Sequence, residues 1–172
     1  GLAFNARWNS VGSDYFSTLG LPLLRGRAFT QAESESPGAP AVAIIDEALA
    51  KKLWPEGDAL GQRIQFAERD APIASEDGNR VGSSASISAR ASDPKAIEIV
   101  GIVRNTLWDL FADHQNGTIF VPFAQGFQSN VFFHVRSATR APGTDAATID
   151  TIRRELRAAA PGVPLLTTKT FR

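Results

Sequence analysis

Two short runs of apolar residues place the strongest constraint on the fold. Residues 41–45 (Ala-Val-Ala-Ile-Ile) and 96–104, which contain Ile-Glu-Ile-Val-Gly-Ile-Val, carry branched side chains on both faces of an extended chain. Such runs are typical of strands covered on both sides, and each therefore predicts a buried strand, central in the case of 96–104. Both are much shorter than the ~20 residues that span a bilayer, so we expect any membrane anchor to lie outside these residues.

Three helices are expected beside these strands. Asp46 can cap one whose apolar side chains share a single stripe, formed by Ala48, Leu49, Leu53 and Trp54. Thr144 can cap the longest helix, residues 145–160. Residues 14–19 predict a short helix that ends at Gly20, since glycine is favoured just past a helix C-terminus.

Alternation of apolar and polar residues predicts further strands over residues 4–11, 62–66 and 130–137. Short segments bounded by turn residues predict others over 21–25, 118–123 and 163–168. Pro122 cannot donate to a strand ladder, so it marks a sheet edge or a strand end. Residues 31–40 are rich in Ser, Pro and Gly and predict a loop. Residues 68–95 lack periodicity and predict a flexible excursion or a weak hairpin. The order of elements predicts an α+β fold with mixed sheets and helices on one face.

Composition argues against several classes of function. The 18 basic and 18 acidic residues balance, and the densest basic group lies among acids on the predicted last helix: Arg153, Arg154 and Arg157. We therefore expect a solvated helix face and no nucleic-acid partner. The sequence has no cysteine, which excludes disulfides and thiolate chemistry. It has no methionine either, so we expect the chain to be part of a longer protein.

No group of residues predicts catalysis. Of the two histidines, His134 falls inside a predicted strand, where a structural role is the simpler interpretation. Asp109, Asp113 and His114 form the tightest cluster of metal-ligand types, but a polar turn explains them equally well. The glycine-bounded residues 57–61 lack the Gly-Lys-Ser/Thr ending of a phosphate loop and predict a turn. We therefore expect no catalytic, cofactor-binding or metal-binding residue, no cofactor, and no enzyme activity.

Six segments, in order along the chain, carry a resemblance to a known family. They are Val-Gly-Ser-Asp-Tyr-Phe-Ser-Thr-Leu-Gly at 11–20, Pro-Leu-Leu-Arg-Gly-Arg-Ala-Phe at 22–29, Ala-Val-Ala-Ile-Ile-Asp-Glu-Ala-Leu-Ala at 41–50 with Leu-Trp-Pro at 53–55, Asp-Ala-Leu-Gly-Gln-Arg-Ile at 58–64, Ile-Val-Gly-Ile-Val at 99–103 and Ile-Phe-Val-Pro-Phe at 119–123. Together they resemble the periplasmic core domain of MacB-like and FtsX-like ABC transporter permeases. Their glycines and Asp46 suit turns and a helix cap, which are structural roles.

The resemblance implies two lobes. Residues 1–30 and 115–172 would form a porter-like βαβ lobe whose first half is missing from the chain, and residues 31–114 an inserted small α/β lobe. A half lobe would leave strand backbone unpaired and an apolar face exposed, so we expect the chain to self-associate.

The resemblance also implies a function. The chain would be an extracytoplasmic domain at the periplasmic face of the bacterial inner membrane, held there by flanking membrane helices. It would transmit conformational change and bind envelope partners or cargo, with no chemistry of its own. Its partners would be other segments of the permease, a periplasmic adaptor or lipoprotein, and a separate cytoplasmic ATPase. The residues expected to contact a partner are Trp108, Phe111 and Phe127.

Two other functions stay open. In a stand-alone extracytoplasmic ligand-binding or sensor domain, five aromatic residues would line a pocket: Trp54, Trp108, Phe111, Phe123 and Phe127. Positions on buried faces are the competing interpretation for Trp54 and Phe123. A hydrolase that uses both histidines is the third alternative. A gene that encodes membrane helices before and after this 172-residue segment would favour the permease. A gene that encodes a signal peptide before it and a stop codon shortly after it would favour the sensor.

Overall fold

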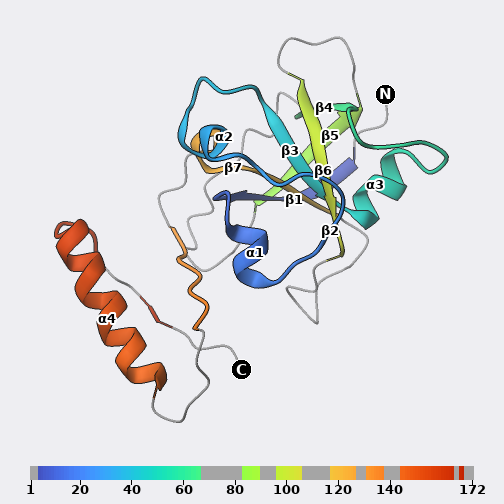
Figure 1. Ribbon diagram of the computed structural model, residues 1–172. Helices are drawn as coiled ribbons and strands as arrows, with labels where there is room; N and C mark the ends of the chain where they lie inside the picture. Colours follow the sequence, from blue (N-terminus) through green and yellow to red (C-terminus); the bar gives the residue numbers. More distant parts are fainter. Residues whose placement is uncertain are drawn as a thin grey trace. The chain divides into compact units, whose positions relative to one another are not determined.

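The computed structural model describes residues 4–66, 83–89, 96–105, 117–126, 131–137, 144–164 and 167–168. These residues belong to two compact units, Gly1–His134 and Val135–Arg172, and each unit is described by itself. Figure 1 colours the elements in chain order. Those of the first unit are β1 (Phe4–Val11), α1 (Tyr15–Leu19), β2 (Leu23–Gly26), α2 (Gln31–Glu35), β3 (Val42–Asp46), α3 (Glu47–Leu53), β4 (Arg63–Phe66), β5 (Ser83–Ala89), β6 (Ile97–Val103), β7 (Thr118–Pro122) and the 3₁₀ turn η1 (Phe123–Gln125).

The described strands pair in the order β2-β6-β3-β7-β1-β5-β4, and β4 pairs in addition with β6. The six strands from β6 through to β4 therefore close into a ring. One edge of β6 is shared, because its first residues pair with β4 whereas Gly101–Val103 pair with β2. The β3–β6 and β1–β7 pairs are parallel and the others antiparallel. The predicted α+β class with a mixed sheet is confirmed.

The two faces of the sheet carry two cores. All five residues of β3 are buried, and alternation along the strand divides its side chains between the faces. Ala43 and Ile45 belong to a first core with Trp8, Ile99 and Ile119, which α3 covers with Leu49. Val42 and Ile44 belong to a second core with Phe29 and Phe120, which α1 covers with Phe16. Helices α3 and α1 therefore cover different faces of the sheet, because β3 is apolar on both.

The central strand predicted over residues 96–104 is confirmed as β6, which pairs with β3 (Figure 1). Pro122 is the last residue of β7, which lies between β3 and β1. The strand-end interpretation of this proline is therefore right and the edge interpretation is wrong. β1 pairs on both sides, with β5 and with β7. The open edge that led us to expect self-association is therefore not present at β1.

One element lies where none was predicted, and another agrees with only one of two predictions, the weak hairpin, since β5 pairs antiparallel with β4. Helix α2 occupies the first half of the expected loop 31–40, because Thr30 and Glu33 cap each other and stabilise a short helix despite the loop-like composition. Strand β5 lies inside the expected excursion 68–95, and its backbone pairs with β1 and β4. Its sequence is mostly Ser and Ala, so the strand has no apolar pattern that would predict it.

Two predicted strands are not strands where the structure describes them. Residues 131–137 have no regular structure, and Val131, Phe132 and Phe133 are 48%, 51% and 68% exposed. Residues 163–164 and 167–168 are likewise irregular, and Val163 is exposed. Residues 130–137 carry the alternating pattern, yet the described part of that segment takes no place in the sheet.

The second unit contains α4 (Thr144–Ala159), the predicted long helix. Its apolar stripe of Ile149, Ile152 and Leu156 is half-buried. The opposite face is solvated as expected, with exposed ion pairs from Arg153 to Asp150 at 3.5 Å and from Arg154 to Glu155 at 3.7 Å.

The lobe boundaries at residues 1–30, 31–114 and 115–172 stay a prediction. Strands from both expected lobes take part in one sheet, since β1 and β7 pair with each other and β7 also pairs with β3.

Candidate functional site

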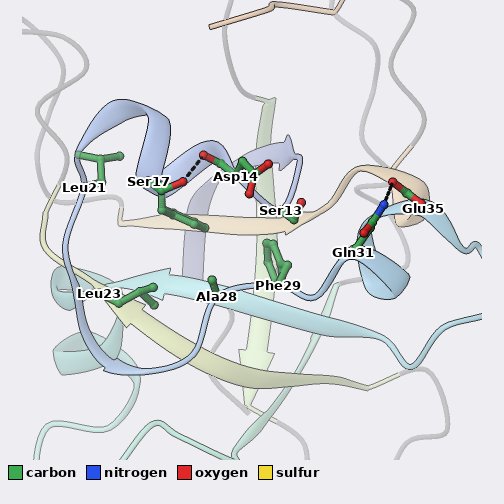
Figure 2. A pocket seen from close by; sticks show the side chains of 10 residues that line it. Ser13, Asp14, Ser17, Leu21, Leu23, Ala28, Phe29, Gln31 and Glu35 are labelled. Carbon is green, nitrogen blue, oxygen red and sulfur yellow. Dashed lines mark hydrogen bonds between the residues drawn. The ribbon is translucent and has the colours of Figure 1, made fainter. Parts of the chain in front are cut away.

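A groove of about 630 Å³ lies between α1, α2 and the chain that follows β2 (Figure 2). We call it the α1–α2 groove, and it is lined by Ser13, Asp14, Phe16, Ser17, Leu21, Leu23, Ala28, Phe29, Gln31 and Glu35. Its size falls in the range of small-molecule and peptide side-chain pockets.

The wall formed by α1 is held by aromatic packing. Phe16 is 2% exposed, and its ring meets Phe120 of β7 edge-on at 5.2 Å and Phe29 at 6.2 Å between centroids. Gly20 ends the helix in the left-handed conformation with φ 67°, as predicted, because a residue with a Cβ is strained there. Asp14 is the N-cap residue, but its side chain makes no capping hydrogen bond. The Ser17 hydroxyl donates instead to the Asp14 carbonyl at 2.9 Å.

The wall formed by α2 is held by a buried carboxylate. Glu33 is 7% exposed and accepts two hydrogen bonds from the Arg27 guanidinium, at 2.9 and 2.7 Å. It also accepts from the Thr30 backbone N–H at 2.8 Å, and the Thr30 hydroxyl accepts from the Glu33 N–H at 3.2 Å. The Arg27 guanidinium, followed by the Thr30 bonds, lowers the pKa of Glu33 to about 2 against the cost of burial. The α2 wall is therefore preformed.

The groove itself is negatively charged. Its two ionisable lining residues are Asp14, at the start of α1, and Glu35, at the end of α2, and none of the ten lining residues is basic. Figure 2 shows Glu35 accepting a hydrogen bond from Gln31, whose Nε2 lies 2.9 Å from Oε1. The nearest guanidinium in sequence, that of Arg27, is already paired with Glu33. Apolar side chains of Leu21, Leu23, Ala28 and Phe29 also line the groove.

The other buried carboxylate, Asp46, connects three elements. One oxygen accepts the Leu49 N–H of α3 at 2.8 Å, as the predicted cap requires, and the other accepts the Thr118 N–H of β7 at 2.7 Å. Burial raises the pKa of Asp46, and these two hydrogen bonds oppose that effect. Both oxygens are occupied by backbone donors, so Asp46 acts in the fold.

The glycine-bounded residues 57–61 form the predicted turn. Asp58 accepts the Leu60 N–H at 3.1 Å and a bidentate ion pair from Arg25, at 2.9 and 2.6 Å, which connects the turn to β2. These roles agree with the structural interpretation of this segment.

The residues expected to contact a partner, Trp108, Phe111 and Phe127, lie outside the described residues, as do Asp109, Asp113 and His114. No cluster of three metal-ligand side chains occurs in the ranges that the structure describes.

Three other residues singled out from the sequence are described. Trp54 is half-buried against the first core, as expected. Phe123 is 41% exposed, so the expectation that it is buried is wrong. His134 lies in an irregular segment rather than a strand, where its ring meets Tyr15 edge-on at 5.7 Å and burial lowers its pKa.

The α1–α2 groove was not predicted. The Thr-x-x-Glu pattern at Thr30 and Glu33 is a known helix-start signal and could have indicated α2. Nothing in the sequence brings α2 next to α1, because that proximity depends on the packing of Phe16 and Phe29 into the same core.

One family model and two solved structures bear on the identity of the chain. The family model described as the MacB-like periplasmic core domain matches residues 3–159. The periplasmic region of MacB from Actinobacillus actinomycetemcomitans superposes with a TM-score of 0.52 and 13% identity, over 91% of this chain and 64% of that one. The extracellular domain of the noncanonic ABC-type transporter YknZ from Gram-positive bacteria gives a TM-score of 0.39 and 18% identity, over 70% and 53%.

The identity to the MacB structure is low, so that match shows a shared fold alone, and the chain spans less than two thirds of either solved structure. Comparison with curated protein sequences found no match. Within the described part of the chain, no helix has the length and apolar character needed to cross a bilayer.

The family model covers most of the chain, and the six segments noted above fall within it. The chain therefore belongs to the MacB-like periplasmic core domain family of ABC transporter permeases and is an extracytoplasmic domain.

Proposed function

We propose that this domain transmits conformational change from an ATP-driven permease to the periplasm and binds an envelope partner or cargo there, without catalysing a reaction. The observation that carries the proposal is the family match over residues 3–159. Its partners would be the other permease segments, a separate cytoplasmic ATPase, and a periplasmic adaptor or lipoprotein.

The use of the buried polar groups supports a non-catalytic role. Glu33 is committed to Arg27 and Thr30, and Asp46 to two backbone N–H groups. A general acid or base needs a carboxylate oxygen that is free to exchange a proton with substrate. The oxygens of Glu33 and Asp46 instead accept hydrogen bonds that stabilise the fold.

The closed ring of strands supports a mechanical role. Every strand of the ring pairs on both sides, so the ring is expected to move as one body rather than deform. Motion that reaches the domain would then be passed on through its surface elements, which include α1 and α2.

Hydrogen–deuterium exchange of the complete permease tests the proposal. The permease would be placed in lipid nanodiscs with its ATPase, and exchange in this domain would be compared with and without ATP. We expect changes in peptides that cover α1 and α2, with β3 and β6 unchanged as an internal reference. A hydrolysis-deficient ATPase is the matched control. Identical exchange throughout the domain while ATP is being hydrolysed would contradict the proposal.

A stand-alone ligand-binding or sensor domain is the second candidate, and the α1–α2 groove favours it, since its volume suits a small ligand. The gene distinguishes the two, because the permease requires membrane helices on both sides of the domain.

A further inference from the structure

We propose that the α1–α2 groove is a docking site for a basic segment of a periplasmic partner protein, with a lysine or arginine side chain placed between Asp14 and Glu35. The inference rests on the proposed function, which requires a partner, and assigns that partner's site and chemistry.

The first support is the rigidity of both walls. α1 is anchored by Phe16 in the second core, and α2 by the Glu33–Arg27 pair and the reciprocal Thr30 cap. A site that exists before its ligand arrives loses less entropy when it binds. The groove therefore differs from a chance depression between mobile loops.

The second support is the charge of the groove. Asp14 and Glu35 come from different walls, and none of the lining residues is basic (Figure 2). Asp14 does not use its carboxylate to cap α1, so the group can take a ligand without loss to the helix. Arg27 neutralises Glu33 and not these two carboxylates. A cation is the complement of this surface, and an anionic lipid headgroup would be repelled.

The third support is the apolar part of the groove lining, called here the apolar floor. Leu21, Leu23 and Ala28 line the groove together with Phe29. Lysine and arginine have long apolar stems that pack on such surfaces while the charged head stays at the rim. Apolar side chains supply no ligand to a metal ion, and the described residues offer no cluster of three metal ligands.

The occupant is therefore a segment with alternating basic and apolar residues. The groove is small beside a standard protein interface, so we expect one segment of the partner to fill it and the affinity of that segment alone to be weak. Attraction between exposed charges is screened by salt, so the affinity should fall as ionic strength rises.

Titration of the 172-residue chain with short peptides, followed by ¹⁵N–¹H NMR, tests the inference. The probe is the acetylated, amidated pentapeptide Ala-Lys-Leu-Lys-Ala, and its counterpart carries glutamate in place of lysine. We expect the lysine peptide to shift amide signals of residues 13–17 and 28–35, and the glutamate peptide to leave them unchanged.

The matched variants are Asp14→Asn with Glu35→Gln, which keep the shape of both side chains, and Glu56→Gln, which removes an exposed carboxylate outside the groove. The double variant should weaken peptide binding about five- to tenfold, and Glu56→Gln should leave it unchanged. A dispersed spectrum of each variant shows that it is folded.

Three outcomes would overturn the inference: no shifts at the groove, equal affinity of the double variant, or equal binding of the glutamate peptide. Competition by spermine at equal affinity would assign the groove to free polyamines and also overturn it. An ATP-linked exchange change that persists in the double variant would show that the proposed function stands even where the groove assignment fails.

Discussion

Replacing Glu33 by glutamine should destabilise the domain in a manner that depends on pH. Glutamine keeps the shape of the side chain and one acceptor oxygen, so the Thr30 N–H can still be satisfied. The variant loses the negative charge that pairs with Arg27 through two hydrogen bonds. The α2 wall of the groove should loosen as a result.

The magnitude follows from the pKa of Glu33. A fall from the ordinary value of 4.5 to about 2 corresponds to an upper limit of about 3.4 kcal/mol, at about 1.36 kcal/mol for each pKa unit. The Arg27 side chain is 50% exposed, and solvent screens such pairs strongly. We therefore expect Glu33→Gln to lower the free energy of unfolding by about 1–2 kcal/mol at pH 7.

The sign of the pH dependence is fixed by the same values. Because the folded-state pKa lies below the unfolded-state value, the stabilisation is present above pH 4.5 and is lost as the pH falls towards 2. At pH 3 roughly 40% of it should remain. The difference between wild type and Glu33→Gln should therefore shrink by more than half between pH 7 and pH 3.

Urea denaturation of both proteins at a series of pH values measures this difference directly. Glu56→Gln, at an exposed position, is the matched control and should differ little from wild type at every pH. A gap between wild type and Glu33→Gln that stays constant down to pH 3 would refute the reasoning, as would a variant as stable as wild type at pH 7.

Two other substitutions test the packing around α3, both followed by urea denaturation. In Asp46→Asn, either the Leu49 or the Thr118 N–H faces the amide NH₂ group instead of an acceptor oxygen, which should lower the free energy of unfolding by about 1–3 kcal/mol. An unchanged free energy of unfolding would contradict the role of Asp46 as an acceptor for both N–H groups. Gly117→Ala places a Cβ about 2.5 Å from the Leu49 side chain and should lower the free energy of unfolding by about 1–3 kcal/mol. In the control Gly12→Ala the new Cβ meets nothing within 4 Å, so stability should not change. Equal stability of the two alanine variants would show that α3 does not approach Gly117 so closely.

Local sequence determined the elements whose signals need no distant partner. The run of branched residues at 41–45 produced β3, because a continuous apolar strand can only be accommodated with both faces covered. Asp46 capped α3 through its own side chain, and Gly20 ended α1 through its freedom at positive φ. The family resemblance rested on these same segments, since caps, turns and buried strands leave a recognisable order along the chain.

Tertiary structure alone decided the rest. β5 is a strand because β1 and β4 offer it hydrogen-bonding edges, whereas its Ser and Ala residues carry no pattern of their own. Residues 131–137 have the alternating pattern but are not paired in the sheet, so they stay irregular and expose Phe133. The α1–α2 groove exists because Phe16 and Phe29, distant from β7 in sequence, pack into one core with Phe120. Hydrogen bonds and packing contacts between residues far apart in sequence form only when the whole chain folds, so no local pattern of side chains specifies them.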